Sequence, residues 1–261
     1  MGAELGIGAL GSLVATLVWV ASAGLYYRYR NQRPFARLFS FNRSRKVVFV
    51  FPGRLGGPGN KGLIQNARIS FEDMLAANYL QRCLSLAGWS PEMVEMREDR
   101  AFLANSQDAE DNLVILCSPK SNSVTEQLLR KVDERHGLKW SFEKKPNDEM
   151  EIHTNGGHWE SATYAQAASI TAAGGRVADG ALDDVAMIVK AANPHNAAAS
   201  IFIVAGVRGI GTWGAAYYLR QNAQSLSART KGRPFAVLLK VHYNAWRIES
   251  IEEAVPPFVL T

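Results

Sequence analysis

Three glycines at GxGxxG spacing, Gly209, Gly211 and Gly214, come directly after an apolar run and open a helical pattern. Glycines at this spacing let a phosphate approach the backbone, while a helix N-terminus presents N–H groups and the positive end of its dipole. Arg208 and Thr212 lie within the same turn and could donate further hydrogen bonds. This segment therefore predicts a site for an anion, with a nucleotide as the cofactor class that it fits.

Two features argue against a full dinucleotide site. The motif lies late in the chain, with no complete βαβ unit after it, and the next apolar run, 237–243, contains no acidic residue for a ribose. The alternative interpretation is that the glycines permit only a tight turn and close packing of helix against sheet. Both interpretations remain open on the sequence.

A second polar turn, 118–125 (SPKSNSVT), also joins an apolar run to a helical pattern. Lys120 and Asn122 are its candidate ligand-binding residues, because an anion at a helix start would be within their reach. The alternative is ordinary capping, since Ser123 and Glu126 have the spacing of a capping box.

Asn193 and Asn196 follow the apolar run 184–191 and are candidates for reading a base or a ribose, with His195 between them as a proton carrier. An Asn-Pro turn explains the same residues without a ligand.

Other motifs point away from several chemistries. The glycine-rich loop 53–62 is not a P-loop, because Gly62 follows Lys61 where Ser or Thr should hold Mg²⁺. His153 and His158 do not have metal-ligand spacing, so we predict no metal site. Glu72, Asp73 and Glu126 are the carboxylates considered for chemistry, and Glu126 and Glu72 are the ones assigned to catalysis if the protein is an enzyme. Asp73 and Glu126 are also explained by capping.

These residues need a scaffold of strands and helices. Short apolar runs predict strands at 46–51, 92–96, 112–117, 184–191, 200–205 and 235–243, with 246–251 returning antiparallel to the last. Capping signals and apolar spacing predict helices at 70–87, from 123 onward and from 209 to about 223.

The alternation of strands and helices predicts an α/β domain over 46–261, a Rossmann-like, mostly parallel sheet with helices on both faces. Residues 138–182 do not follow this alternation, and 140–143 with 149–153 read as a hairpin inserted into the domain. Ligands in such folds bind at the carboxyl ends of the strands, where the glycines and short polar residues fall.

The first 27 residues predict a transmembrane helix, because 5–27 carries no charge and about 20 apolar residues cross a bilayer. A cleaved signal peptide is the rival, but the basic residues follow the apolar segment rather than precede it. The positive-inside rule then places the N-terminus outside and the domain in the cytoplasm, as a single-pass protein of the cell membrane. Gly8, Ser12 and Ala15 lie at near-helical spacing and could form a helix contact that allows a homo-oligomer. The alternative is that they are ordinary small residues of a lipid-facing helix.

The net charge of +5 is unevenly distributed. Residues 1–46 hold seven of the 29 basic residues and one of the 24 acids, so the remainder has 22 basic and 23 acidic residues. The excess belongs to a basic juxtamembrane linker, 28–45, whose natural partner is a bilayer with anionic headgroups. Nucleic acid is disfavoured as a partner, since no basic patch with interleaved aromatics follows. Cys83 and Cys117 form no disulfide framework, in keeping with a cytoplasmic domain.

Segments 118–125, 193–196 and 205–212 (AGVRGIGT) carry a resemblance to bacterial membrane-anchored Rossmann-like proteins. The chain is also similar, more distantly, to nucleoside deoxyribosyltransferase-like and TIR-like nucleotide-sensing domains. The resemblance covers 46–245 as a pattern and only the turns residue by residue, and Cys117-Ser118 stand where that pattern has glycines. It implies a nucleotide-related ligand and, for some members, cleavage of an N-glycosidic bond, and it assigns no catalytic residue here.

The sequence thus favours a membrane-anchored cytoplasmic domain that binds a nucleotide or another phosphorylated small molecule, as a sensor or signalling module. The alternatives are an N-glycosidase or transferase acting on a nucleoside or NAD, with Glu126 or Glu72 as its carboxylate, and a non-catalytic membrane scaffold.

Overall fold

The computed structural model describes residues 2–53, 69–105, 107–146, 149–161, 181–244 and 247–261, and the side chains of these residues apart from 2–13 and 181. Its main sheet has seven strands in the order β10-β9-β7-β8-β3-β1-β2. The strands are β1 (Val47–Phe51), β2 (Val94–Glu98), β3 (Asn112–Leu116), β7 (Ala181–Asn193), β8 (Asn196–Gly206), β9 (Phe235–Asn244) and β10 (Arg247–Val259).

Five of the seven strands run in the same direction. β8, β3, β1 and β2 pair in parallel, whereas β7 is antiparallel to both of its neighbours, β8 and β9, and β10 is antiparallel to β9. The predicted mostly parallel sheet is confirmed, but the strand expected at 184–191 runs against both of its neighbours, as one arm of a long hairpin with β8. β10 is an edge strand, the place in a sheet where Pro256 and Pro257 are tolerated.

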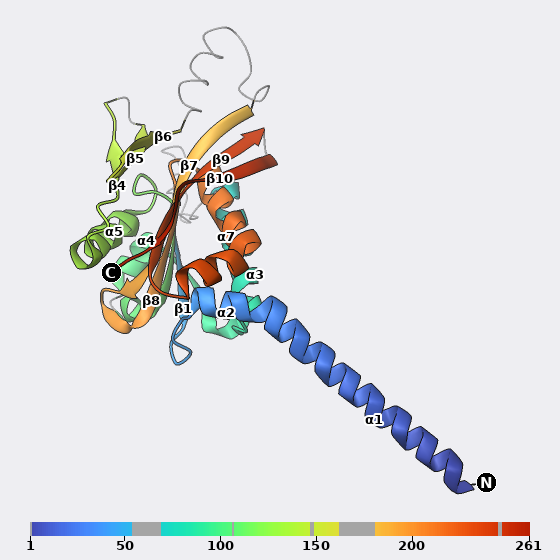
Figure 1. Cartoon of the computed structure of the whole chain (residues 1–261). Coiled ribbons are helices and arrows are strands. Elements are labelled where there is room, and N and C mark those ends of the chain that lie inside the picture. Colours follow the sequence, from blue (N-terminus) through green and yellow to red (C-terminus); the bar gives the residue numbers. More distant parts are fainter. Residues whose placement is uncertain (1, 54–68, 106, 147–148, 162–180, 245–246) are drawn as a thin grey trace, which may run out of the picture.

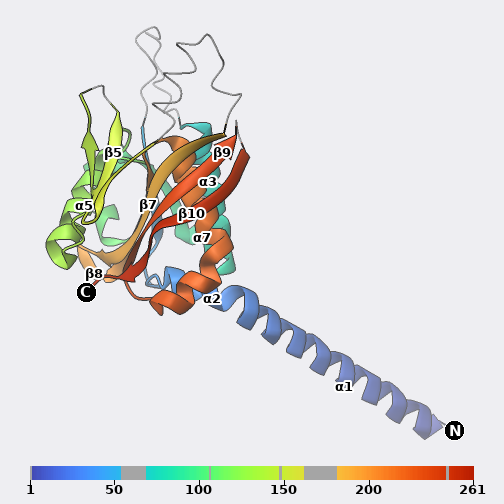
Figure 2. The same cartoon turned by 45° about the horizontal axis from the view of Figure 1, so that its top comes forward.

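Helices cover both faces of this sheet (Figures 1 and 2). One face carries α2 (Arg33–Phe39), α3 (Phe71–Leu86) and α7 (Gly209–Thr230), and the other carries α4 (Asp99–Ala104) and α5 (Ser123–His136). α1 (Gly2–Tyr27) projects from the domain, and the π-helical turn η1 (Arg28–Gln32) joins it to α2. Two short 3₁₀ turns, η2 (Pro91–Met93) and η3 (Asp108–Glu110), complete the described helices.

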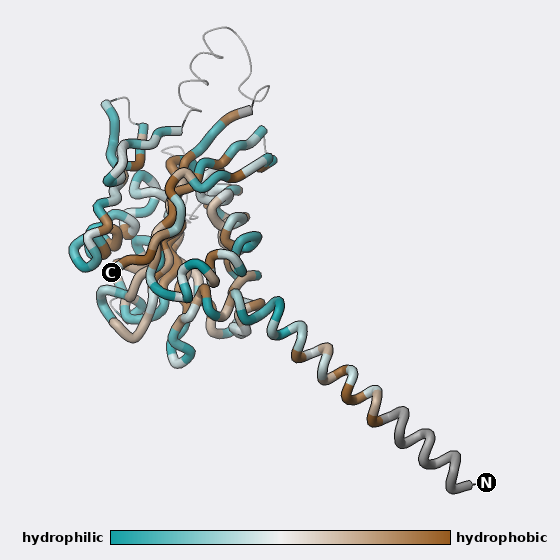
Figure 3. The backbone as a smooth tube through the Cα atoms, viewed as in Figure 1, coloured by the Kyte–Doolittle hydropathy of each residue, from teal (hydrophilic) through white to brown (hydrophobic). Residues whose placement is uncertain are grey.

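The sheet is buried on both sides, which explains why its strands read as continuous apolar runs. In β1, Val47 and Phe49 face the core under α2, α3 and α7, while Val48 and Val50 face the core under α5. Figure 3 shows the central strands as the most hydrophobic part of the described domain.

The hairpin predicted within 138–182 is confirmed, and a third strand joins it. β4 (Ser141–Lys144), β5 (Met150–Thr154) and β6 (Gly157–Glu160) form a separate antiparallel sheet. Met150 and Ile152 of β5 bury their side chains in the core under α5, so this small sheet is packed against the domain. Residues 162–180, which fall within the predicted insertion, lie outside the described residues.

The segment predicted as a linker, 28–45, is instead folded into the domain from residue 33 onward. Leu38 and Phe39 of α2 are fully buried, and Phe41 follows them into the same core. The Nζ of Lys190, a buried residue of β7, donates hydrogen bonds to Ser40 Oγ (2.7 Å) and to the carbonyl oxygen of Gly232 (2.6 Å). Burial lowers the pKa of Lys190 to about 8. The many arginines of this segment made it read as a polar linker, although its apolar residues anchor α2 in the core.

α1 is a single helix from Gly2 to Tyr27 that extends away from the domain (Figure 1). Its side chains from residue 14 onward are exposed. Among the residues whose side chains the structure describes, no helix has both the length and the apolar character that a membrane span needs.

Candidate ligand-binding site

A cavity of about 200 Å³ lies at the carboxyl ends of β3 and β8. The turn after β3 supplies Lys120 and its neighbours, and the turn after β8 supplies Arg208. Asp73, from the first turn of α3, completes the wall. The full lining is Asp73, Cys117, Ser118, Lys120, Ser121, Gly206, Val207, Arg208, Gly209 and Thr212.

Four of the sequence-predicted binding residues meet at this cavity. Lys120 comes from one strand end, and Arg208, Gly209 and Thr212 come from another. The two turns are adjacent because β3 pairs in parallel with β8, which brings their carboxyl ends to one edge of the sheet. The expectation that ligand-binding side chains gather at strand ends is the reason that sequence reasoning could group them.

The glycine-rich turn, however, already has a hydrogen-bond acceptor supplied by the chain. Asp184, at the start of the buried part of β7, accepts hydrogen bonds on Oδ2 from the backbone N–H of Gly211 (2.7 Å) and Arg208 (3.1 Å). Its Oδ1 accepts from the N–H of Val185 at 2.8 Å. The N-terminus of α7 is therefore occupied by a carboxylate where the sequence predicts a phosphate.

Gly211 is required by this internal contact. A Cβ at position 211 would lie 2.6 Å from Asp184 Oδ2 and 3.0 Å from the carbonyl oxygen of Val185. A Cβ at Gly214 would lie 2.6 Å from the Val241 side chain of β9. These two glycines thus serve close packing of α7 on the sheet, which is the alternative that the sequence left open.

Asp184 is fully buried, and burial raises its pKa to about 7, against the opposing effect of its backbone hydrogen bonds and of Arg208. Burial disfavours the charged carboxylate, whereas N–H donors and a nearby guanidinium favour it. The Asp184 carboxyl group, which lies beside the turn from β8 into α7, therefore titrates near neutral pH.

Thr212 has a structural role as well as a place in the cavity wall. Its Oγ1 accepts a hydrogen bond from the N–H of Gly206 at 3.0 Å. A Cβ at Gly206 would lie 2.4 Å from the backbone nitrogen of Thr212, so only glycine fits there. This contact closes the turn from β8 into α7.

On the other side of the cavity, Cys117 has a φ of 77°, in the left-handed region that favours glycine. Its carbonyl oxygen accepts a hydrogen bond from Thr125 Oγ1 at 2.7 Å, which fixes this conformation. The position where the resembling pattern has glycine thus keeps the backbone geometry of glycine. Strained backbone of this kind clusters at ligand sites.

Asn122 does not line the cavity. Its Nδ2 donates to the carbonyl oxygens of Val50 (3.1 Å) and Leu116 (2.8 Å), and its Oδ1 accepts from the N–H of Val124 at 3.0 Å. Asn122 is therefore the N-cap of α5, and the prediction that Ser123 is the cap is wrong. These three bonds commit its amide to joining β1, β3 and α5.

Ser123 donates hydrogen bonds to Asp99 and does not cap the helix. Asp99 Oδ2 accepts from Ser123 Oγ (2.9 Å) and from the Ser123 N–H (3.2 Å), and its Oδ1 accepts from the N–H of Gly53 (3.1 Å). A carboxylate of the chain thus lies at the start of α5, as at α7. Sequence reasoning missed both aspartates, although Asp184 carried a signal as an acid entering an otherwise apolar run.

The predicted catalytic carboxylates are placed differently from each other. Glu126 is exposed on α5 and does not line the cavity. Glu72 is half-buried beside Gly209, where a Cβ would lie 3.1 Å from the Glu72 Cβ. Asp73, next to it, is 3% exposed and is the carboxylate among the described residues that line the cavity.

Asn193 and Asn196 lie at the opposite edge of the sheet, because β7 is antiparallel to its neighbours. Asn193 Nδ2 donates to the carbonyl oxygens of Ala109 and Asp111, and Asn196 Nδ2 donates to that of Glu110. They fasten the β7–β8 hairpin to η3, and the expectation that they join the other ligand-binding residues is corrected.

Two other predictions concern the rest of the chain. His153 and His158 are paired across β5 and β6, and no group of three metal-ligating side chains occurs within the described residues. Most of the glycine-rich loop 53–62 lies outside the described residues.

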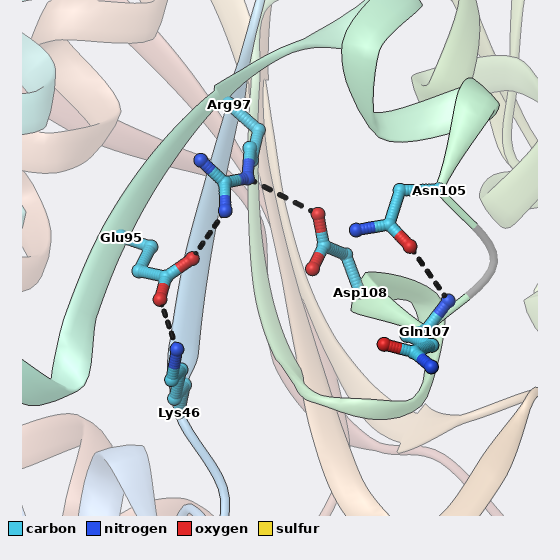
Figure 4. Close-up of polar contacts among 6 residues, drawn as sticks. All are labelled: Lys46, Glu95, Arg97, Asn105, Gln107 and Asp108. Carbon is cyan, nitrogen blue, oxygen red and sulfur yellow. Dashed lines mark hydrogen bonds and ion pairs between the residues drawn. The ribbon is translucent and has the colours of Figure 1, made fainter.

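A second polar cluster lies at the amino-terminal edge of β1 and β2 (Figure 4). Glu95 accepts from Lys46 and from Arg97 (2.7 Å), and Arg97 Nε also pairs with Asp108 at 3.1 Å. Two cations and two carboxylates neutralise one another, so this cluster ties β2 to its surroundings.

Comparisons of the chain with protein-family models, with characterised proteins and with solved structures found no match in any of the three.

Proposed function

We propose that this protein is a membrane-anchored domain that binds a phosphorylated small molecule in the cavity at the ends of β3 and β8. The observation that carries the proposal is the convergence of Lys120 and Arg208 on one cavity from two separate strand ends. Two cations beside hydroxyl groups favour an anionic ligand.

Side chains, rather than glycine amides, would hold the anion. The N–H groups of Arg208 and Gly211 already donate to Asp184, so the phosphate of the ligand would contact the Lys120 ammonium and the Arg208 guanidinium. Ser118, Ser121 and Thr212 supply hydroxyl groups, and Asp73 is placed to accept hydrogen bonds from ligand hydroxyls. The described cavity, at about 200 Å³, is smaller than the roughly 300–1,000 Å³ of typical ligand pockets, which favours a compact phosphorylated compound or one end of a nucleotide.

The anchor is proposed from α1 and the sequence that forms it. Residues 5–27 carry no charge and lie within one helix, with the basic segment directly after them. At about 1.5 Å per residue these 23 residues extend roughly 35 Å, against about 30 Å for the hydrocarbon core. The same argument proposes an outside N-terminus and a cytoplasmic domain in the cell membrane.

The test is a thermal-shift titration of the full chain in detergent with ribose 5-phosphate, adenosine monophosphate and inorganic phosphate. A ligand at about 100 times its Kd stabilises the folded state by roughly 2.7 kcal/mol. Replacing Lys120 by Ala should weaken binding roughly tenfold or more, because a hydrogen bond to a charged group is lost.

The matched control is Arg135→Ala, which removes one positive charge from the exposed face of α5. It should bind as the parent protein does. If no phosphorylated compound shifts the unfolding temperature, or if both variants weaken binding equally, the proposed site is wrong and the scaffold alternative gains support.

The enzyme alternative is favoured by one observation, the buried carboxylate of Asp73 in the cavity wall. Incubation of the full chain with nucleosides, nucleotides and NAD, followed by analysis for a released base, tests it. Turnover that is lost in Asp73→Asn while ligand binding persists would support an N-glycosidase or transferase. If every compound remained intact, the enzyme alternative would be excluded and only the binding function would remain.

A further inference from the structure

A second cavity, of about 500 Å³, lies where α1, η1 and α2 meet α7. Arg30, Arg33 and Arg37 line it from the N-terminal helices, and Gln224 and Ser227 line it from α7. Its volume falls within the range of about 300–1,000 Å³ that small-molecule sites occupy. We refer to it as the arginine cavity.

The three arginines share one side of the helical segment, because they are three and four residues apart. Among the described residues, no carboxylate lines the arginine cavity, and none of the three arginines forms an ion pair. All three arginines are exposed, so solvent screens the repulsion among their guanidinium groups, and an anion between them would relieve what remains of it. This arrangement differs from the neutral cluster of Lys46, Glu95, Arg97 and Asp108, in which cations and carboxylates balance.

The guanidinium groups are oriented by their surroundings. Arg33 stacks over the ring of Tyr29 at 4.9 Å, and Arg30 lies over the ring of Tyr26 at 5.8 Å while also bonding its hydroxyl. Stacked arginines lose little freedom when they form planar hydrogen bonds to a phosphate. The backbone also departs from a regular helix here, since the N–H of Arg33 bonds to the carbonyl oxygen of Arg28 in a π turn. π turns within helices are frequent at functional sites.

The cavity wall is fixed in place, unlike a mobile basic tail. α2 is held by the fully buried Leu38 and Phe39 and by the hydrogen bond from Lys190 to Ser40 at its end. Ser227, on the α7 side, is only 3% exposed and contributes a hydroxyl group to the wall.

We propose that the arginine cavity binds the phosphate headgroup of an anionic phospholipid. The proposal rests on the membrane anchor proposed above. The uncharged helical sequence ends at Tyr27, and the cavity begins with Tyr26 and Tyr29, which lie at the depth where aromatic residues meet headgroups. A lipid phosphate at that depth would lie between Arg30, Arg33 and Arg37.

The test compares two double variants of the full chain that lose equal charge. Arg30→Gln with Arg33→Gln removes two of the three cavity arginines, and Arg28→Gln with Arg45→Gln removes two cations of the same basic segment that do not line the described cavity. Each protein is reconstituted into phosphatidylcholine vesicles that contain a minor fraction of phosphatidylglycerol. Flotation measures insertion, and native mass spectrometry of the released protein measures the retained lipid.

We expect both variants to float, and phosphatidylglycerol retention to fall roughly tenfold or more only in Arg30→Gln with Arg33→Gln. Equal loss in both variants would indicate diffuse attraction to the membrane surface and would overturn the proposal. Chains that fail to float would overturn the membrane anchor and, with it, the lipid. Binding of inorganic phosphate to the detergent-solubilised parent chain, lost in the same cavity variant, would assign the cavity to a soluble phosphate and would also overturn the lipid.

Discussion

At the residue scale, the start of α7 is organised by Asp184. Its carboxylate accepts the N–H groups of Gly211 and Arg208, so the helix dipole and two backbone donors stabilise an internal charge. Without these two donors the buried carboxylate would keep only the Val185 N–H, and the helix start would have unsatisfied N–H groups. The turn and the aspartate therefore depend on each other.

Replacing Gly211 by Ala should destabilise the domain, although alanine is normally the better helix former. The new Cβ would lie 2.6 Å from Asp184 Oδ2, so helix or carboxylate must move, at a cost of about 1–3 kcal/mol in the free energy of unfolding. Gly209→Ala is the matched control, because its nearest contact, the Glu72 Cβ at 3.1 Å, is 0.5 Å longer than the nearest contact at position 211. Chemical denaturation of the two variants measures the difference. Equal effects would contradict the close approach at Gly211.

The stability of the domain should depend on pH through Asp184. Its pKa is raised from near 4 in the unfolded chain to about 7 in the folded chain, so the folded state holds the extra proton between these values. The free energy of unfolding should fall as pH rises from 4 to 7, by at most on the order of 1 kcal/mol per pH unit, and this contribution should level off above 7.

Asp184→Asn isolates that contribution, because an asparagine oxygen can still accept from Gly211 and Arg208. Denaturation curves of the parent and the variant, recorded between pH 5 and pH 8, give the difference in slope that belongs to this carboxyl. Parallel curves would show that Asp184 stays ionised throughout, and that the hydrogen bonds outweigh the burial.

At the element scale, α2 shows how a short helix can join a basic segment to a core. Phe39 stacks on Phe202 of β8 with ring centroids 4.8 Å apart, and Phe41 contacts the same ring edge-on at 5.7 Å. The domain therefore begins near residue 33, before its first strand.

Phe39→Ala should lower the free energy of unfolding by about 3–5 kcal/mol, the cost of removing a fully buried aromatic ring. Phe71→Ala, at a ring that is 53% exposed, should cost much less. Urea denaturation of both variants measures these effects. If the two losses were similar, α2 would not be an integral part of the core.

Much of this element structure could be predicted from local sequence. The runs at β1, β3, β8 and β9 are apolar because both sheet faces are covered, and Ser70 caps α3 by accepting from the N–H of Asp73 as its capping box predicts. The direction of β7 could not be predicted, because a buried run reads the same in either direction. α2 was missed because arginines dominate the composition around Leu38 and Phe39.

The candidate site was only partly predictable for a related reason. Lys120 and Arg208 could be brought together by reasoning about strand ends, since the parallel pairing of β3 and β8 follows from the fold class. Asp184 is 27 residues from Gly211 and Asp99 is 24 residues from Ser123. Hydrogen bonds across such separations depend on tertiary packing, which residue spacing does not encode.

At the scale of the whole molecule, the two cavities lie at opposite ends of the main sheet. α2 contacts the amino-terminal edge, through Ser40 with Lys190 and through Arg37 with Gly232. The cavity with Lys120 and Arg208 lies at the carboxyl edge, which points away from α1 in Figure 1. With α1 in a bilayer, the arginine cavity would face the headgroups and the other cavity would open toward the aqueous phase. A soluble ligand and a lipid could therefore bind at the same time.

The unbroken path of helix from α1 through η1 into the anchored α2 has a mechanical consequence. Each residue of an α-helix turns the chain by about 100°, so the face that the domain presents along the membrane is set by the rotational phase of α1. If α1 changed its tilt or its rotation in the bilayer, the whole domain would rotate with it as a rigid unit. In a pair of chains associated through α1, the angle between the two domains would then be dictated within the lipid, a long way from either cavity.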